Sequence, residues 1–279
     1  MSIFDTSKEV HFVGALRCAE QQHNNTFVSH GRIKFGIPQK WVEEGEEHGT
    51  GRGDYFEGTF AACHDFNADG IRQISTKYQL PDDRILITHY GNHFYFKRKK
   101  SLLLPTFCLY GIKFDLFEID PKIGWQKING TIPGQYFQAF GNVKNSIKDI
   151  PLEKQPSVVW IKNLDEFKNR LISKLTSLGI DEKEIIYTFV SYYDFNHYGN
   201  LDWFDLNVQF PDELRIKHKD FEYQSEIRFI VNSKNETAMQ ELRNTTIDIG
   251  SIEDIAQKVD GYFEHGLDIK MKIDIEVKE

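Results

Sequence analysis

The chain has 279 residues, of which 40% are hydrophobic and 27% are charged, and its net charge at neutral pH is −8. These values are typical of a globular protein with a sizeable core. The acidic balance argues against a generic phosphate-tracking surface, because such surfaces are strongly basic. Aromatic residues make up 14% of the chain, which favours strands, since flat side chains pack well on a pleated surface.

The cysteines and the hydropathy of the chain indicate the cellular compartment in which the protein is expected. Cys18, Cys63 and Cys108 are widely spaced, which fits neither a disulfide framework nor a zinc site. No apolar run approaches the ~18 residues of a membrane-spanning helix, and the first residues lack a signal-peptide pattern. We therefore expect a cytoplasmic protein without a membrane partner.

The first part of the chain predicts short strands and helices. A strand is expected over 10–16, a helix over 18–27, a half-buried strand from Gly31, and a short helix from Pro38. After a glycine-rich stretch, residues 84–99 predict a hairpin that turns at Gly91-Asn92.

The remaining pattern contains one long helix. A strand buried on both faces is expected at 102–112, and further strands at 157–162 and 184–195. The helix begins at the capping residue Asn163 and ends at Gly179. A strand at 221–231, a helix from Ser251 and a closing strand at 267–277 follow. Strands and helices do not alternate regularly, which predicts an α+β class rich in β-strands. No linker composition interrupts the chain, so a single domain over 1–279 is expected.

The strand from Phe221 to Val231 is the first candidate for chemistry. Alternation places Glu222, Gln224, Glu226 and Arg228 on one face and apolar side chains on the other. One interpretation is a solvated outer face of an antiparallel sheet. The other is that Gln224 and Glu226 point into a cleft, where a carboxylate beside a neutral amide stabilises an oxocarbenium-like transition state.

The segment Gly51 to Gly58 is the second candidate. Its glycines permit close approach of the backbone to a ligand, while Arg52 and Asp54 can pair or bind polar groups. Stacking surfaces are offered by Trp41, Tyr55 and Phe56. A flexible surface loop is the competing interpretation.

Other chemistries have weaker support in the sequence. The histidines show no HExxH spacing, no CxxC is present, and neither a phosphate-binding glycine signature nor a GxSxG elbow occurs. No metal site is predicted. A metal-dependent nuclease using Asp54, Glu57 and Glu226 stays an alternative, weakened because Arg228 rather than a lysine stands near Glu226.

Three segments together carry a resemblance: "HGRIKFGIPQKW", "GRGDYFEG" and "FEYQSEIRFIV". They resemble a broad group of poorly characterised bacterial and phage proteins, which is distantly similar to ADP-ribosyltransferases. The resemblance extends over about residues 10 to 260, although its motifs are short. It implies two packed sheets, a split β-sandwich with peripheral helices, that hold NAD in a cleft.

The resemblance also implies roles for individual residues. A Q-x-E motif maps onto Gln224, Ser225 and Glu226, with Glu226 as the catalytic carboxylate and Gln224 orienting the acceptor. The family's middle Ser-Thr-Ser motif is replaced here by Cys108, Leu109 and Tyr110. The residues expected to bind NAD are Arg17 or His11 on an early strand, Tyr110 stacking on nicotinamide, and Arg52, Asp54 and Tyr55 of the glycine-rich loop.

The function implied by the resemblance is an ADP-ribosyltransferase that uses NAD as its substrate. The family's setting implies a toxin or phage-defence effector, an unidentified protein or nucleic-acid acceptor, and room for an inhibitory partner protein. The altered middle motif keeps a second hypothesis open, a non-catalytic nucleotide-binding module of the same fold.

Overall fold

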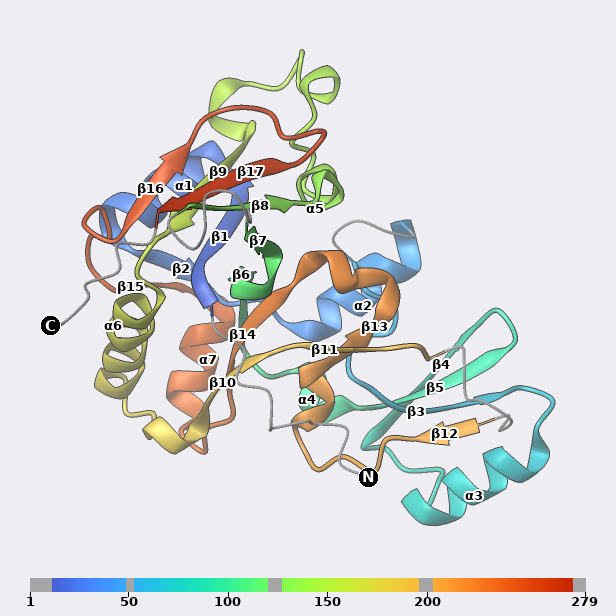
Figure 1. Ribbon diagram of the computed structural model, residues 1–279. Helices are drawn as coiled ribbons and strands as arrows, with labels where there is room; N and C mark the ends of the chain where they lie inside the picture. The colour runs from blue at the N-terminus through green and yellow to red at the C-terminus, as the bar shows by residue number, and fades with distance from the viewer. Residues whose placement is uncertain (1–11, 49–52, 120–126, 196–202, 273–279) are drawn as a thin grey trace, which may run out of the picture. The chain divides into compact units, whose positions relative to one another are not determined.

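The structure is a computed structural model that describes residues 12–48, 53–119, 127–195 and 203–272 (Figure 1). These residues group into two compact units. Unit 1 is formed mainly by residues 33–108 and 174–247, and unit 2 mainly by residues 12–32, 109–173 and 248–272. Both contain helices and mostly antiparallel strands, which confirms the predicted α+β class.

A four-stranded antiparallel sheet forms one part of unit 1. Its strand order is β12 (Trp203–Asp205), β3 (Thr59–His64), β5 (His93–Arg98) and β4 (Ile85–Tyr90), and α3 (Ala68–Tyr78) follows β3. The β4–β5 hairpin turns at Gly91-Asn92 as predicted, with φ of 58° at Gly91. Aromatic residues, including Phe60, Tyr95 and Phe96, fill the core beneath this sheet.

The second part of unit 1 contains the candidate strand. β10 (Ile185–Phe189) pairs antiparallel with β14 (Glu226–Val231), and β11 (Ser191–Tyr193) pairs in parallel with β13 (Ile216–His218). Short 3-10 helices span Glu182–Glu184, Asp212–Arg215 and Lys219–Gln224. The further elements are α2 (Pro38–His48), α4 (Lys99–Leu102), α7 (Glu236–Asn244), and the pair formed by β2 (Arg32–Lys34) and β15 (Thr246–Asp248).

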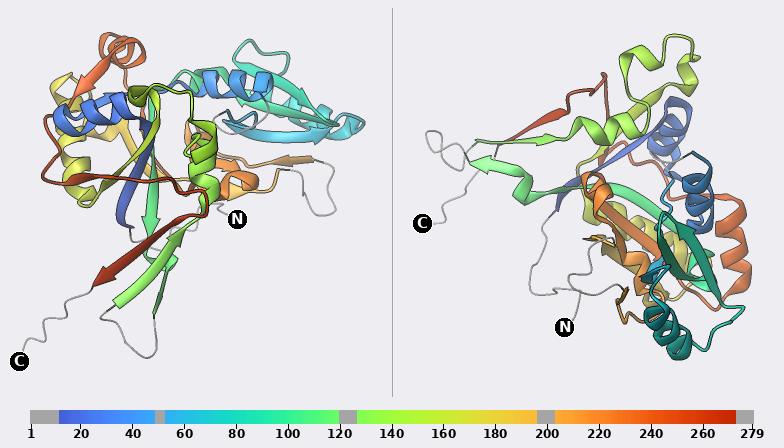
Figure 2. Two further views of the ribbon diagram at one scale, coloured as in Figure 1. Left: turned by 90° about the horizontal axis from the view of Figure 1, so that it is seen from above. Right: turned by 90° about the vertical axis from the view of Figure 1, so that its right-hand side faces the viewer.

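Unit 2 contains two antiparallel sheets. The first has the order β6 (Thr106–Lys113, which begins in unit 1), β1 (Phe12–Glu20), β9 (Pro156–Ile161) and β16 (Ala256–Val259). The second has β17 (Leu267–Lys272), β8 (Lys127–Ile132) and β7 (Phe117–Ile119) side by side (Figure 2). The remaining elements are α1 (Gln21–His30), α5 (Gly134–Ala139), most of α6 (Leu164–Ser177), and 3-10 helices at Phe114–Leu116, Lys144–Ser146 and Leu152–Lys154.

The long helix was well predicted. α6 begins after Asn163, whose side-chain Oδ1 accepts a hydrogen bond from the Glu166 backbone N–H at 3.0 Å. Its apolar positions at helical spacing are buried, and Gly179 follows with φ of 82°.

One predicted helix forms but begins later than expected, and another is absent. β1 continues to Glu20, so the helix expected from Cys18 begins only at Gln21. The helix expected from Ser251 does not form, because Ala256–Val259 pairs with β9 as strand β16. Pairing with a distant strand overrides the helical spacing of its apolar residues. For the final strand, β17 covers 267–272, and positions 273–277 lie outside the described residues.

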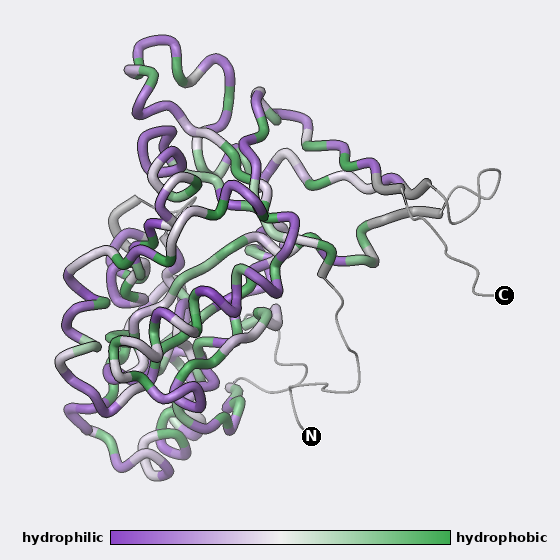
Figure 3. Tube along the Cα trace, turned by 90° about the vertical axis from the view of Figure 1, so that its left-hand side faces the viewer, coloured by the Kyte–Doolittle hydropathy of each residue, from purple (hydrophilic) through white to green (hydrophobic). Residues whose placement is uncertain are grey.

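Hydrophobic stretches along the trace are short and separated by hydrophilic ones (Figure 3). Among the helices that the structure describes, none is long and apolar enough to cross a membrane.

Candidate functional site

The segment expected to be one strand from Phe221 is divided in two. Residues Lys219–Gln224 form a 3-10 helix, Ser225 has a left-handed conformation with φ of 41°, and only Glu226–Val231 is strand. The predicted shared strand face of Glu222, Gln224, Glu226 and Arg228 is therefore wrong. The His218 side chain accepts a hydrogen bond from the Asp220 N–H, which helps to begin the helical turn.

Arg228 lies at the centre of a buried ionic network in unit 1. Its guanidinium is fully buried and donates to both carboxylate oxygens of Glu57, at 2.6 and 2.8 Å. Nε donates to Glu226 Oε2 at 2.8 Å, and Nη1 also donates to the Leu214 carbonyl at 2.7 Å. The Trp41 ring lies 5.7 Å from the guanidinium carbon. Neither face of β14 is solvated at this position, which excludes the solvated-face interpretation for Arg228.

Lys217 joins the amide and the carboxylate of the Q-x-E motif. Its Nζ donates to Gln224 Oε1 and to Glu226 Oε1, each at 2.6 Å. The same ammonium lies 3.8 Å from Asp54 Oδ2 and 4.8 Å from the centre of the Phe221 ring. Gln224 and Glu226 therefore meet at one ammonium, although they do not share a strand face. We define the buried ionic network as Asp54, Glu57, Lys217, Gln224, Glu226 and Arg228.

The cations of this network keep Glu226 ionised. Burial alone would raise its pKa, but the Arg228 guanidinium and the Lys217 ammonium outweigh burial and lower the pKa of Glu226 from 4.5 to about 2. Glu226 is also the carboxylate of the network that keeps some exposure, 11% of its side chain. Its backbone N–H donates to the Tyr192 hydroxyl at 2.9 Å. A fixed negative charge thus stands at the start of β14.

Asp54 has the opposite electrostatic environment. Burial raises its pKa from 3.8 to about 6, with Glu57 acting in the same direction and Lys217 against it. Oδ1 accepts a hydrogen bond from the Phe56 N–H at 2.9 Å, whereas Oδ2 is buried without a hydrogen-bond partner. Buried carboxylate oxygens normally accept a hydrogen bond. Asp54 is therefore the member of the network whose hydrogen bonding is incomplete.

Two aromatic residues of the glycine-rich segment, Tyr55 and Phe56, directly follow Asp54 of the network. Tyr55 is buried beside Tyr90, at 4.9 Å between ring centres, and the Lys97 ammonium lies 4.6 Å from its ring centre. Phe56 stacks on His218 at 4.6 Å. Of the predicted stacking residues, Tyr55 and Phe56 are therefore packed against protein rings, and Trp41 lies beside the Arg228 guanidinium.

Two residues predicted to bind NAD belong to unit 2. Arg17 donates to Asn24 Oδ1 at 2.8 Å, its guanidinium lies 4.5 Å from the Phe27 ring centre, and burial lowers its pKa to about 10. Tyr110 is buried with its ring 4.6 Å from that of Tyr136. His11 and Arg52 lie outside the described residues.

Lys217 is a member of the candidate site that the sequence did not reveal. A lysine does accompany Glu226, contrary to the prediction, because β13 brings Lys217 to it from nine positions earlier in the chain. The alternation in "LRIKH" is the one local signal for this strand, and it does not reveal the partner.

The carboxylates proposed for a metal-dependent nuclease are separated by cations. Lys217 stands between Asp54 and Glu226, and Arg228 bridges Glu226 and Glu57. Within the described ranges, no group of three or more His, Cys, Asp or Glu side chains is placed to hold a metal ion.

Comparisons of the chain with known protein families, with curated proteins and with solved structures return no match.

Proposed function

We propose that the protein is a NAD-dependent ADP-ribosyltransferase whose catalytic carboxylate is Glu226. The observation that carries this proposal is that Lys217 joins Gln224 and Glu226, at 2.6 Å each, while Glu226 stays ionised with a pKa of about 2. Cleavage of a glycosidic bond develops positive charge on the ribose, and a preorganised carboxylate lowers the energy of that state.

In this proposal each member of the motif has a distinct task. Glu226 binds the nicotinamide ribose and stabilises the oxocarbenium ion, and Gln224 orients the acceptor. Lys217 and Arg228 position Glu226 and touch no reacting atom. The proposal includes the split pair of packed sheets that is typical of ADP-ribosyltransferases. It also includes NAD as the substrate, a macromolecular acceptor, and a role as a toxin or phage-defence effector.

A matched pair of substitutions tests the role of Glu226. Glu226→Gln removes the charge with almost no change in shape, and it should reduce nicotinamide release from NAD at least 100-fold. Glu222→Gln makes the same chemical change at an exposed position four residues earlier and should leave release unchanged. Equal activity in both variants would refute the assignment.

Folding has to be measured alongside activity, because Glu226 also pairs with two buried cations. Thermal melts of each variant report on this. The double variant Lys217→Met/Glu226→Gln removes an anion and a cation together, so it restores the charge balance if the single variant unfolds. It should be folded and inactive, and an active double variant would also refute the role of Glu226.

A non-catalytic nucleotide-binding module is the second candidate. It is favoured by the fact that both Glu226 oxygens already accept hydrogen bonds, from Lys217 and from Arg228. In that case NAD should raise the melting temperature of the wild-type protein while no nicotinamide forms.

A further inference from the structure

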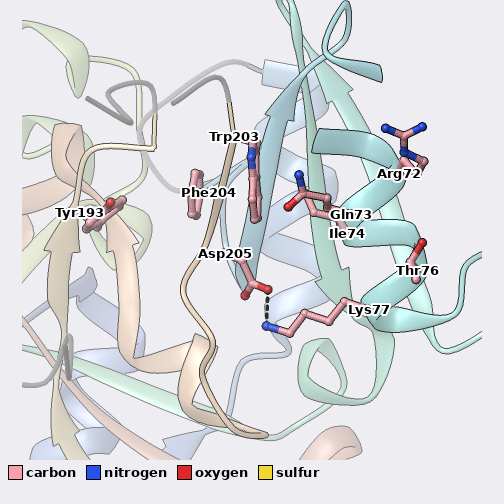
Figure 4. Close-up of a pocket in the computed structure, with 9 residues that line it drawn as sticks. All are labelled: Arg72, Gln73, Ile74, Thr76, Lys77, Tyr193, Trp203, Phe204 and Asp205. Atoms are coloured by element: carbon pink, nitrogen blue, oxygen red, sulfur yellow. Dashed lines mark hydrogen bonds and ion pairs between the residues drawn. The ribbon is translucent and has the colours of Figure 1, made fainter. Parts of the chain in front are cut away.

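A pocket of about 840 Å³ lies in unit 1, between the helix α3 and the strands β11 and β12 (Figure 4). Its size falls in the ~300–1,000 Å³ range of small-molecule sites. The lining residues are Arg72, Gln73, Ile74, Thr76 and Lys77 of α3, Tyr193 of β11, and Trp203, Phe204 and Asp205 of β12.

This pocket is distinct from the buried ionic network. Successive side chains of β11 point to opposite sides of the strand, so Tyr192 and Tyr193 have different neighbours. The Tyr192 hydroxyl accepts the Glu226 N–H, whereas Tyr193 lines the pocket and packs 5.7 Å from the Phe204 ring. A ligand of the pocket would therefore lie across β11 from Glu226.

The aromatic walls of the pocket are held in place by close packing. A Cβ atom at Gly70 of α3 would lie 2.9 Å from the Trp203 Cβ, so the glycine allows Trp203 to approach the helix. Phe204 stacks on Phe195 with ring centres 5.5 Å apart and an angle of 7°. Trp203 and Tyr193 are only partly buried, which leaves ring surface for a planar ligand.

The polar groups of the pocket favour an uncharged ligand. Lys77 donates to Asp205 Oδ2 at 2.6 Å, so the charged pair drawn in Figure 4 is neutral. Arg72 is paired with Asp69. Gln73 extends from α3 toward the Trp203 ring (Figure 4) and carries one amide donor group and one acceptor.

We infer that this pocket binds an adenine ring, stacked on Trp203 and hydrogen-bonded at its edge by Gln73. A glutamine amide matches the N6–H donor and the N7 acceptor of adenine in a bidentate pair, and base stacking on an aromatic side chain contributes ~1–3 kcal/mol. The inference is independent of the proposed function, because it requires neither a nicotinamide–ribose bond nor Glu226.

Calorimetric titration of the full chain with adenosine tests the site. Saturable binding is expected with a dissociation constant of about 1 mM or tighter. Gln73→Leu, an exposed change on α3, should weaken binding about 10-fold, the loss of one bidentate pair. Trp203→Leu should abolish it. Lys183→Ala removes an exposed cation that does not line the pocket and should bind as the wild type does.

Related ligands identify the part of the molecule that is recognised. AMP should bind about as tightly as adenosine, because Lys77 is neutralised by Asp205 and Arg72 is so exposed that solvent screens its charge. Uridine should bind at least 10-fold more weakly. Failure of adenosine to saturate would overturn the inference, as would binding that Gln73→Leu leaves unchanged. Since adenosine cannot release nicotinamide, a negative result here says nothing against Glu226, and an inactive protein with NAD says nothing against this pocket.

Discussion

Arg228 determines how the candidate site is built at the level of single residues. A fully buried guanidinium that bonds two carboxylates and a backbone carbonyl compensates for its own desolvation only while all its partners are present. Removing one partner leaves the others charged and buried. The stability of the network is therefore cooperative, and the position of the proposed catalytic carboxylate Glu226 depends on the same contacts.

Replacing Arg228 by methionine should destabilise the protein by about 3–5 kcal/mol, because Glu57 and Glu226 lose a buried counter-ion. Urea unfolding monitored by circular dichroism measures the free energy of unfolding. Arg72→Met is the matched control, since the Arg72–Asp69 pair is about three-quarters exposed and contributes little. Similar losses in the two variants would contradict the account of the network.

Asp54 should make stability depend on pH in an unusual direction. Its folded-state pKa of about 6 exceeds the unfolded value near 3.8, so its contribution is fully present below pH 3.8 and is lost as the pH rises through 6. Asp54→Asn removes this titration. The stability difference between the variant and the wild type should move in favour of the variant by roughly 2–3 kcal/mol from pH 4 to pH 7.5. Parallel stability profiles would show that Asp54 titrates normally.

Glu226 should make stability depend on pH in the opposite direction to Asp54. Its folded-state pKa of about 2 lies below the unfolded value of 4.5, so its contribution is present above pH 4.5 and is lost as the pH falls toward 2. Asp54 therefore lowers stability as the pH rises from about 3.8 to 6, whereas Glu226 lowers it as the pH falls from about 4.5 to 2. Each effect is measured against that residue's own amide variant.

At the level of elements, the ends of helices and turns are set by backbone conformation. Gly31 ends α1 with φ of 62°, and a Cβ there would lie 2.2 Å from the Gly250 carbonyl oxygen. Gly31→Ala should therefore cost more than the ~1–2 kcal/mol of a left-handed residue alone. Gly91→Ala is the control, because Gly91 has φ of 58° and no atom within 4 Å of the added Cβ. Thermal melts in which both variants lose the same stability would contradict the clash.

Elements with local signals were predictable from the sequence. The cap at Asn163 and the turn at Gly91-Asn92 are encoded by neighbouring residues, and both were found. The division of the segment around Ser225 was not predicted, because alternation alone does not show a left-handed serine. The apolar spacing after Ser251 suggested a helix, but its pairing with β9 depends on residues about one hundred positions away.

The same difference between local and long-range signals explains which residues of the candidate site the sequence revealed. A short motif made Glu226 and Gln224 candidates, and the structure brings both of them to Lys217. Lys217 was not, since its contact with Glu226 depends on the position of β13 and not on spacing within one element. Glu57 was named as a candidate metal ligand, and its pairing with Arg228, 171 positions away, became visible only in three dimensions.

For the whole molecule, composition and element order were sufficient to predict the fold class. They did not show which segments group into each compact unit. The aromatic content and the irregular order of elements predicted α+β, which the structure shows. Each compact unit, however, is assembled from segments far apart in sequence, as in the pairing of β1 with β9. Such pairings are long-range, and no local pattern specifies them.

The release of nicotinamide by the purified wild-type chain tests the central claim most directly. The protein is incubated with NAD in the presence of EDTA, and free nicotinamide is measured by chromatography over time. The account predicts metal-independent release that is proportional to protein concentration. A chain that is folded, that binds NAD in a melting assay, and that releases no nicotinamide with or without candidate acceptors would contradict it.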